Sequence, residues 1–438
     1  MLDNFFTFLR FQTISSSNDH KNSMIECSSW LRKFIENIGM KVEIWETAGH
    51  PIVFANHMAA GPDKPTVLIY NHYDVQPVNP LEEWISPPFE PTIRDGEIFA
   101  RGAQDNKGQC FGVLWALKTI MDRDGALPIN IKLCIEGEEE IGSPGLSNIL
   151  NDKSEALSAD YLIVADVGIP SIDTPAVTLG ARGIITMTIT LQGSNGDLHS
   201  GTHGGMVYNP HHALVELLAK LRDSSGRIAI PGFYDDVASI SEKERALISF
   251  DLDQENYKNA FGTAPSGGEK NFSPIESAWI RPTLEINGIS GGHSGSGFKT
   301  VIPCKVEAKL SCRLVPNQDP DTIGKLVSKF LEDNLPDDIT MEIIVHPGVG
   351  DPIRTKPDSS IVHAAANAYE EVFKKKCIFV YDGGSVPISS KLAKASNSDV
   401  VMMGLGLPDD NIHAPNEHFG AERLEMVAQV FTSLLSKL

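Results

Sequence analysis

Positively charged residues are scarce in this 438-residue sequence, which has 37 Lys and Arg against 57 Asp and Glu and a net charge of −20. So acidic a chain is poorly suited to bind the phosphate backbone of a nucleic acid. Hydrophobic residues make up 41% of the sequence and charged residues 21%, a balance that argues against a disordered chain. The length suggests roughly two or three domains, with enough residues to bury a sizeable core.

Long apolar runs are also missing. The longest candidate, from Cys110 to Met121, is interrupted by Lys118 and is shorter than the about 18 residues that a membrane-spanning helix needs. The sequence starts Met1-Leu-Asp-Asn-Phe-Phe, without the basic region and small-residue cleavage site of a secretory signal. We therefore expect a cytoplasmic protein without a membrane span. The six cysteines show no Cys-x-x-Cys spacing and lie mostly in apolar runs, which favours reduced thiols in the core.

Short apolar runs alternate with helical patterns in the first part of the chain. Helices are predicted at residues 21–39 and 108–121, and strands at residues 42–45, 52–56, 66–70, 129–135 and 161–165. Such an alternation predicts an α/β fold with a mostly parallel central sheet flanked by helices.

The pattern changes near Ala181. Strands at 184–191, 283–287, 306–314 and 339–345, with helices at 210–222 and 319–334, follow in the order βαββαβ, which is typical of a ferredoxin-like module. The α/β pattern returns after Pro347, so the second module is inserted into the first. We predict one domain from residues 1–181 and 350–438 and an inserted α+β domain from residues 182–349.

Acidic residues and histidines follow the ends of three predicted strands. His72 and Asp74 follow the strand at 66–70, Glu139 and Glu140 follow the strand at 129–135, and Asp166 follows the strand at 161–165. The carboxyl ends of strands in an open α/β sheet line its ligand crevice, so these side chains are expected to meet there. Imidazoles and carboxylates without a thiolate suit divalent cations, and a carboxylate can bridge two of them.

Two further candidates lie elsewhere in the chain. Asp105 begins a predicted helix, and His413 lies in a loop before the last one. For the run Glu138-Glu139-Glu140 the plain alternative is an exposed acidic turn. Three like charges after a buried strand repel one another unless cations gather there, and this favours a metal site.

Several segments, in one order, resemble the di-zinc amidohydrolase family that includes carnosinase, cytosolic non-specific dipeptidase, carboxypeptidase G, acetylornithine deacetylase and succinyl-diaminopimelate desuccinylase. The dipeptidase branch is the most similar, and the resemblance covers nearly the whole chain. The segments are Asn71-His-Tyr-Asp-Val-Gln-Pro, residues 84–91, Ala100-Arg-Gly-Ala-Gln-Asp-Asn-Lys-Gly, Glu136-Gly-Glu-Glu-Glu-Ile-Gly-Ser, Leu198-His-Ser-Gly-Thr-His-Gly-Gly, Lys299-Thr-Val-Ile-Pro and Ile412-His-Ala-Pro-Asn-Glu.

The resemblance implies a catalytic domain that holds two divalent metal ions per subunit, and a lid and dimerisation role for the inserted domain. Zinc is the favoured metal, with manganese and cobalt as alternatives. The implied ligands are His72 and Asp166 on one ion, Glu140 and His413 on the other, and Asp105 between the two.

Further roles follow from the same resemblance. Glu139 is expected to act as general base for a metal-bridging hydroxide and then to protonate the leaving amine. Asp74 is expected to orient His72. In a homodimer, His199 is expected to reach the partner's active site and stabilise the oxyanion. Arg313, which by spacing alone is an ordinary outward residue of a strand, would grip the terminal carboxylate of the substrate. Weaker substrate-contact matches are Thr300, His346 and Ser385.

Some residues depart from the family pattern and bear on the substrate more than on the reaction. They are Gln104 and Asn106 beside Asp105, Asn287, and His203 within the His199 motif. Asn106 also matches a position where the family commonly has a strained peptide bond.

The implied activity is metal-dependent hydrolysis of an amide bond in a small substrate, with a dipeptide carrying a free C-terminal carboxylate favoured. The alternative is an N-acyl-amino-acid deacylase of the succinyl-diaminopimelate desuccinylase or acetylornithine deacetylase type. A serine hydrolase based on Ser385 is disfavoured because no G-x-S-x-G elbow is present. A non-catalytic metal-binding protein is disfavoured because the implied ligands and base are all present.

Overall fold

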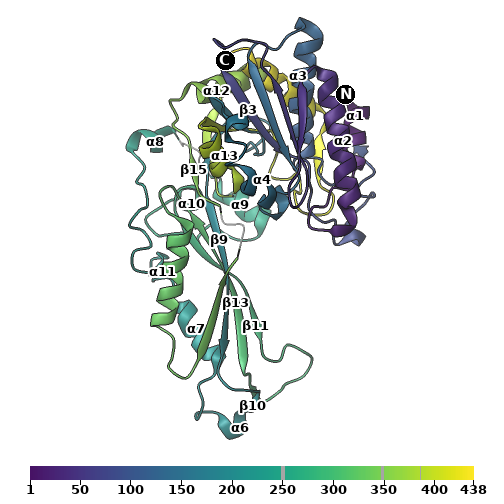
Figure 1. Ribbon diagram of the computed structural model, residues 1–438. Helices are drawn as coiled ribbons and strands as arrows, with labels where there is room; N and C mark the ends of the chain where they lie inside the picture. Colours follow the sequence, from purple (N-terminus) through teal and green to yellow (C-terminus); the bar gives the residue numbers. More distant parts are fainter. Residues whose placement is uncertain (248–251, 347–349, 385) are drawn as a thin grey trace.

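The computed structural model describes residues 1–247, 252–346, 350–384 and 386–438, and Figure 1 shows their arrangement. Its largest sheet has nine strands in the order β1-β2-β6-β3-β7-β17-β8-β15, with β16 paired to β8. The middle strands are parallel: β6 (Asn130–Glu136), β3 (Thr66–His72), β7 (Tyr161–Val164) and β17 (Asp399–Met402). The predicted α/β class with a mainly parallel central sheet is confirmed.

Antiparallel pairs flank this parallel centre. On one side are β1 (Lys41–Trp45) and β2 (Ile52–His57), and on the other are β8 (Ala176–Ala181) and β15 (Ile353–Arg354). β16 (Ile378–Asp382) is parallel to β8. A separate small sheet is formed by β4 (Thr92–Arg94), β5 (Glu97–Phe99) and β18 (His418–Gly420).

Helices cover both faces of the large sheet. Successive residues of a strand point to opposite faces, and in this sheet both sets of side chains are apolar and need to be buried. In β3, Val67 and Ile69 join the core under one set of helices, while Leu68 and Tyr70 join the core on the other face. The first set is α1 (Leu2–Arg10), α2 (Lys21–Ile38), α3 (Lys107–Asp124), α12 (Ser360–Phe373) and α14 (Ala421–Leu435). The second set is α4 (Pro144–Ile149), α5 (Ser154–Leu157) and α13 (Ile388–Ser396). Short 3₁₀ turns are η1 (Asn18–His20), η2 (Leu81–Glu83) and η3 (Glu139–Ile141).

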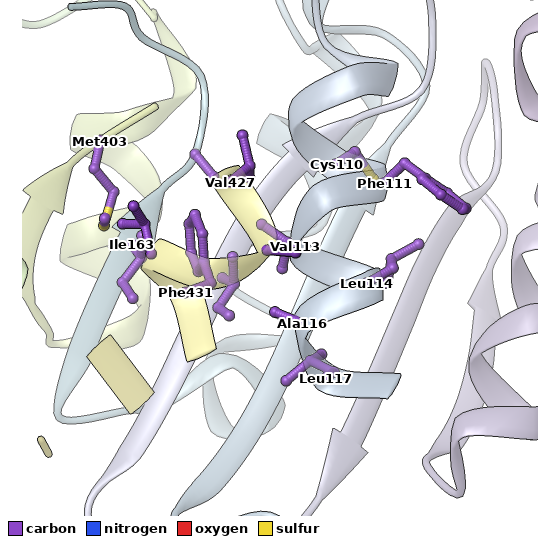
Figure 2. Close-up of a cluster of buried hydrophobic side chains, with 14 of the residues drawn as sticks. Cys110, Phe111, Val113, Leu114, Ala116, Leu117, Ile163, Met403, Val427 and Phe431 are labelled. Carbon is purple, nitrogen blue, oxygen red and sulfur yellow. The ribbon is translucent and has the colours of Figure 1, made fainter. Parts of the chain in front are cut away.

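The core between α3 and α14 fixes the helix that begins just after Asp105. Figure 2 shows Val113 of α3 close to Val427 and Phe431 of α14, and all three are at most 1% exposed. Gly112 allows the closest approach, since a Cβ atom there would lie 2.4 Å from Cγ1 of Val427. The start of α3 is therefore anchored by tight packing.

The chain between the two parts of the large sheet forms a second, four-stranded sheet. Its strands are β9 (Gly183–Gln192), β11 (Thr283–Gly291), β13 (Lys305–Leu314) and β14 (Thr340–Val345), all antiparallel in the order β11-β13-β9-β14. In chain order this is second, third, first, fourth, the ferredoxin-like arrangement that the sequence predicts. Its core includes residues of α7 (Pro210–Lys220) and α11 (Pro320–Asp333).

The far end of this insert carries β10 (Leu198–His199), α6 (Ser200–His203) and β12 (Val301–Ile302). Figure 1 shows β10 and α6 at the end of the insert remote from the large sheet. Between α7 and β11, where the sequence suggests an irregular excursion, the structure has three short helices: α8 (Glu242–Leu247), α9 (Gln254–Phe261) and α10 (Pro274–Trp279).

The change from one sheet to the other falls between Ala181 of β8 and Gly183 of β9. The domain boundaries at 181 and 350 stay a prediction, and residue 349 lies outside the described residues. Among the helices that the structure describes, none has the length and apolarity that a membrane span requires.

Candidate metal centre

The segments that contain the predicted metal ligands meet at one edge of the large sheet. His72 is the last residue of β3, Asp166 lies two residues after β7, and Glu140 lies in η3 after β6. Because these three strands are parallel neighbours, their carboxyl ends point to the same edge. Asp105, just before α3, and His413, in the loop before β18, complete the group.

Asp105 lies between two sets of ligands. Its Oδ1 is 3.1 Å from Nε2 of His72, and its Oδ2 is 2.8 Å from Nε2 of His413. Nε2 of His72 is also 3.6 Å from Asp166 Oδ2, and Nε2 of His413 is 3.3 Å from Glu140 Oε2. Each trio has its potential ligand atoms within 4.8 Å of one another, so each has a donor set that fits one divalent cation.

Asp74 contacts three residues of this centre and holds them in position. It is fully buried, and its Oδ1 lies 3.3 Å from Nδ1 of His72, the ring nitrogen that faces away from Asp105. Its two carboxylate oxygens also accept the backbone N–H groups of Glu139 and Glu140, at 3.2 and 3.1 Å. The backbone carbonyl of Asp74 also lies 3.1 Å from Nδ1 of His72, so Asp74 orients the histidine through its carbonyl and its carboxylate and holds both glutamates in place.

Three amide side chains near the ligands had no predicted contact role from the sequence. Nδ2 of Asn106 donates to Oδ1 of Asp166 at 2.6 Å, and Oδ1 of Asn106 accepts from Nδ2 of Asn71 at 2.7 Å. Nε2 of Gln76 donates to Oε2 of Glu140 at 2.7 Å. Such contacts join residues far apart in the sequence and leave no periodic signal. The Asp105–Asn106 peptide bond is cis, as the family resemblance suggests.

The carboxylates of the centre shift one another's protonation. Burial raises the pKa of Glu139 well above its usual value, and Asp166 and Glu140 raise it further while His72 opposes the rise. Burial and Asp105 raise the pKa of Glu140 to about 7, although His413 lowers it. Hydrogen bonds that the imidazole donates to the carboxylates of Asp105 and Glu140 raise the pKa of His413 to about 10. Cations would replace these protons as the counter-charge, so the donor set favours metal binding.

A third trio of possible ligands is already neutralised by an arginine. Glu97, Asp410 and His418 lie close enough for a metal ion. However, Nη2 of Arg423 is 2.6 Å from Oδ1 of Asp410 and 2.9 Å from Oε2 of Glu97. The guanidinium group of Arg423 therefore supplies the positive charge at this trio, where a cation would otherwise be needed.

The predicted residues of the insert are not all brought to the metal centre. His199 and Thr300 are exposed and adjacent, with the N–H of Ser200 donating to the carbonyl of Thr300 at 3.1 Å. They lie with β10 at the remote end of the insert (Figure 1). Within one chain, neither residue joins the cluster of ligands.

The remaining predicted substrate contacts lie on the insert and near its junction. Arg313, on β13, is half-buried, and burial lowers its pKa while Asp382 of β16 opposes that shift. Nε2 of His346 is 2.7 Å from the hydroxyl oxygen of Thr188. Ser385 lies outside the described residues.

Comparison with known proteins gives consistent matches over nearly the whole chain. Residues 68–437 match the model of peptidase family M20/M25/M40. Cys-Gly metallodipeptidase dug1 from Schizosaccharomyces pombe is 30% identical over 442 residues, covering 97% of this chain and 93% of the relative. Beta-Ala-His dipeptidase from Homo sapiens is 33% identical, covering 84% of this chain and 73% of the relative. The crystal structure of the M20 family metallo-carboxypeptidase Sso-CP2 from Sulfolobus solfataricus superposes with a TM-score of 0.89 at 34% identity, covering 99% and 98% of the two chains.

Proposed function

The chain belongs to peptidase family M20/M25/M40 and is a metal-dependent peptidase, and we propose that its substrates are dipeptides with a free C-terminal carboxylate. The observation that carries the metal-dependent reaction in this proposal is the position of Asp105, whose two carboxylate oxygens face different histidines. A shared carboxylate of this kind suits a pair of divalent cations. The relatives named as Cys-Gly and Beta-Ala-His dipeptidases support the substrate class.

Two divalent ions per subunit would be held by His72, Asp105 and Asp166 on one side and by Asp105, Glu140 and His413 on the other. The ligand types favour zinc, with manganese or cobalt as alternatives. When bound, the ions supply a Lewis acid for the scissile carbonyl and lower the pKa of a nearby water.

Glu139 would act as the general base. It belongs to neither ligand trio, so its carboxylate is available for a proton. Its backbone is fixed by Asp74. It would take a proton from the attacking water and pass it to the leaving amine. The pKa of Glu139, which burial raises in the absence of cations, falls when positive charge enters the centre, and this restores the ionised form that a base needs.

Recognition of the substrate would come from the insert. Arg313 is suited to a bidentate contact with the C-terminal carboxylate, with His346, Ser385 and Thr300 as further contacts. Because His199 and Thr300 are exposed at the remote end of their own chain, we propose that a second copy of the chain supplies them to the centre in a homodimer. His199 would then stabilise the oxyanion. A cytoplasmic location stays a prediction.

The test is a substrate panel assayed with chelator-treated protein, before and after addition of zinc, manganese or cobalt. The panel contains dipeptides, a tripeptide, N-acetyl amino acids and N-succinyl amino acids, and Glu139→Gln protein is the control for contaminating peptidases. Metal-restored cleavage of dipeptides alone is expected. Cleavage confined to acylated amino acids would replace the substrate class with that of a deacylase. Equal cleavage of the tripeptide would favour a carboxypeptidase, the activity named for the relative from Sulfolobus solfataricus.

A further inference from the structure

A second buried glutamate holds the backbone that carries Asp105. Glu417 lies four positions after His413 in the sequence, just before β18, and is fully buried. Its Oε1 accepts the N–H groups of Gln104 and Asp105, both at 3.0 Å. Its Oε2 accepts the N–H of Gly102 at 2.9 Å and Nη1 of Arg101 at 2.7 Å. Both carboxylate oxygens are therefore used, each by two donors.

This set of donors suits an ionised carboxylate and no neutral group. The N–H groups of three residues from one short loop converge on Glu417, and the buried guanidinium of Arg101 balances its charge. A glutamine in the same place has one oxygen and one NH₂ group. One pair of donors would then face another donor, leaving buried N–H groups unsatisfied.

Glu417 also connects two ligand loops that are distant in the sequence. The loop with Asp105 and the loop with His413 are about 300 residues apart, and the carboxylate of Glu417 bonds directly to the backbone N–H of Asp105. The position of Asp105 relative to His413 thus depends on this contact. We propose that Glu417 is a positioning residue that fixes the bridging carboxylate of Asp105 relative to His413 and so sets the affinity of the centre for divalent cations.

The inference rests on the proposed function, because it assumes that Asp105 bridges two cations. It goes further by assigning control of the bridge to a residue that touches neither the cations nor the substrate. Outer partners of metal ligands commonly change metal affinity or activity by about 10–100-fold when they are replaced.

The test compares Glu417→Gln with a matched control in the same loop. Asp410 is also a fully buried carboxylate bound to an arginine, but its partners are Arg423, at 2.6 and 2.7 Å, and the N–H of Leu407. Asp410→Asn therefore disturbs the loop without removing a contact to Asp105. Both variants are titrated with Co²⁺, and both the visible absorption spectrum and the dissociation constants are recorded. Hydrolysis is then measured at saturating metal.

Glu417→Gln is expected to weaken Co²⁺ binding by about 10–100-fold, to change the cobalt spectrum, and to lower kcat with KM changed less than about twofold. Asp410→Asn is expected to lower thermal stability while keeping the wild-type spectrum. Equal changes in both variants would mean that Glu417 only stabilises the loop, and the proposal would be wrong. An unchanged spectrum and affinity in Glu417→Gln would refute it directly.

The experiment also distinguishes a folding defect in the variant from a failure of the proposed function. If Glu417→Gln does not fold, Glu417→Asp keeps the charge for Arg101 but withdraws the carboxylate by about 1.5 Å, and the same shifts in cobalt binding are expected. Failure of both variants to fold would assign Glu417 to the fold and overturn the proposal. If the wild-type protein itself binds fewer than two Co²⁺ ions, the proposed function fails together with this inference, whereas wild-type behaviour of Glu417→Gln at two bound ions overturns the inference alone.

Discussion

Replacement of Glu136 by glutamine should remove a pH dependence of stability that a single buried carboxyl group produces. Glu136 is the last residue of β6, fully buried and in register with His72 of β3. Its Oε1 accepts hydrogen bonds from the hydroxyl groups of Tyr70 and Ser143, at 2.7 and 2.8 Å. Burial raises the pKa of Glu136 from 4.5 to about 8, and the bond from Tyr70 opposes only part of that rise.

The sign of the effect follows from the proton that the folded state retains. Between about pH 4.5 and pH 8, the native protein holds this proton and the unfolded chain has lost it, so the free energy of unfolding falls as the pH rises. The difference of about 3.5 units, 8 − 4.5, corresponds to at most about 5 kcal/mol. This stability is fully present below the unfolded pKa and is lost as the pH rises through the folded pKa.

Urea unfolding followed by circular dichroism, with a chelator present, measures this difference at about pH 5 and about pH 8.5. Glutamine has nearly the same shape and no charge at either pH. We therefore expect Glu136→Gln to match the wild type at the lower pH and to exceed it by a few kcal/mol at the higher pH. Glu26→Gln, on the exposed face of α2, is the control and should follow the wild type. Parallel profiles for Glu136→Gln and the wild type would refute the assignment of a neutral Glu136.

Three other predictions concern the centre and the helix that leads from it. Glu139→Gln should retain two metal ions by elemental analysis while kcat falls by about 10²–10⁴-fold, whereas Glu140→Gln should lose or weaken one ion. Because the pKa of His413 is raised to about 10, its imidazole must lose a proton when a cation binds. Calorimetry at neutral pH, in two buffers of different ionisation enthalpy, should detect at least one proton released per centre, and zero release would contradict the protonated histidine. Gly112→Ala should destabilise the protein by about 1–3 kcal/mol through its clash with Val427, and Val427→Ala in the same chain should restore part of the loss of melting temperature.

The sequence predicts the parts of this fold that depend on regular spacing. Strands β3, β6 and β7 are marked by apolar runs, and the acidic residues after them indicate the edge where ligands gather. The ferredoxin-like order of the insert follows from its alternating strands and two amphipathic helices. The pairing of His72 with Asp166, and of Glu140 with His413, is implied only by the family resemblance, since residue spacing alone leaves open which strand-end residues share an ion.

Other features leave no periodic signal. β8 (Ala176–Ala181) is buried at every position, so it lacks the alternation that marks a strand with one exposed face. The helices α8 to α10 have six to eight residues each, too few for a clear helical period. The contacts of Asn106 and Glu417 join loops that only the folded chain brings together. Local patterns therefore locate the centre, while the groups that hold its ligands in position require the three-dimensional structure.

The length of the insert bears on the proposal that a second copy of the chain supplies His199. Strands β9 and β13 pair along their full ten residues, from Gly183 with Leu314 to Gln192 with Lys305. At about 3.4 Å per residue, this ladder is about 34 Å long. β10, which carries His199, lies beyond the far end of this ladder (Figure 1), so His199 is remote from the metal centre of its own chain. This position supports the proposal that a second copy of the chain supplies His199, because a dimer can pair each centre with the insert of the other subunit.

Mixing two inactive variants tests this arrangement. His199→Ala keeps Glu139 but lacks the donated histidine, and Glu139→Gln keeps the histidine but lacks the base. In a mixed dimer, the centre of the His199→Ala chain receives His199 from its partner and regains both groups. Random assortment of equal amounts gives about half mixed dimers with one of two centres complete, so about one quarter of wild-type activity should return. Action within one chain predicts no recovery after co-expression or subunit exchange, because neither chain then contains both residues, and such a result would rule out the dimer as the source of the histidine.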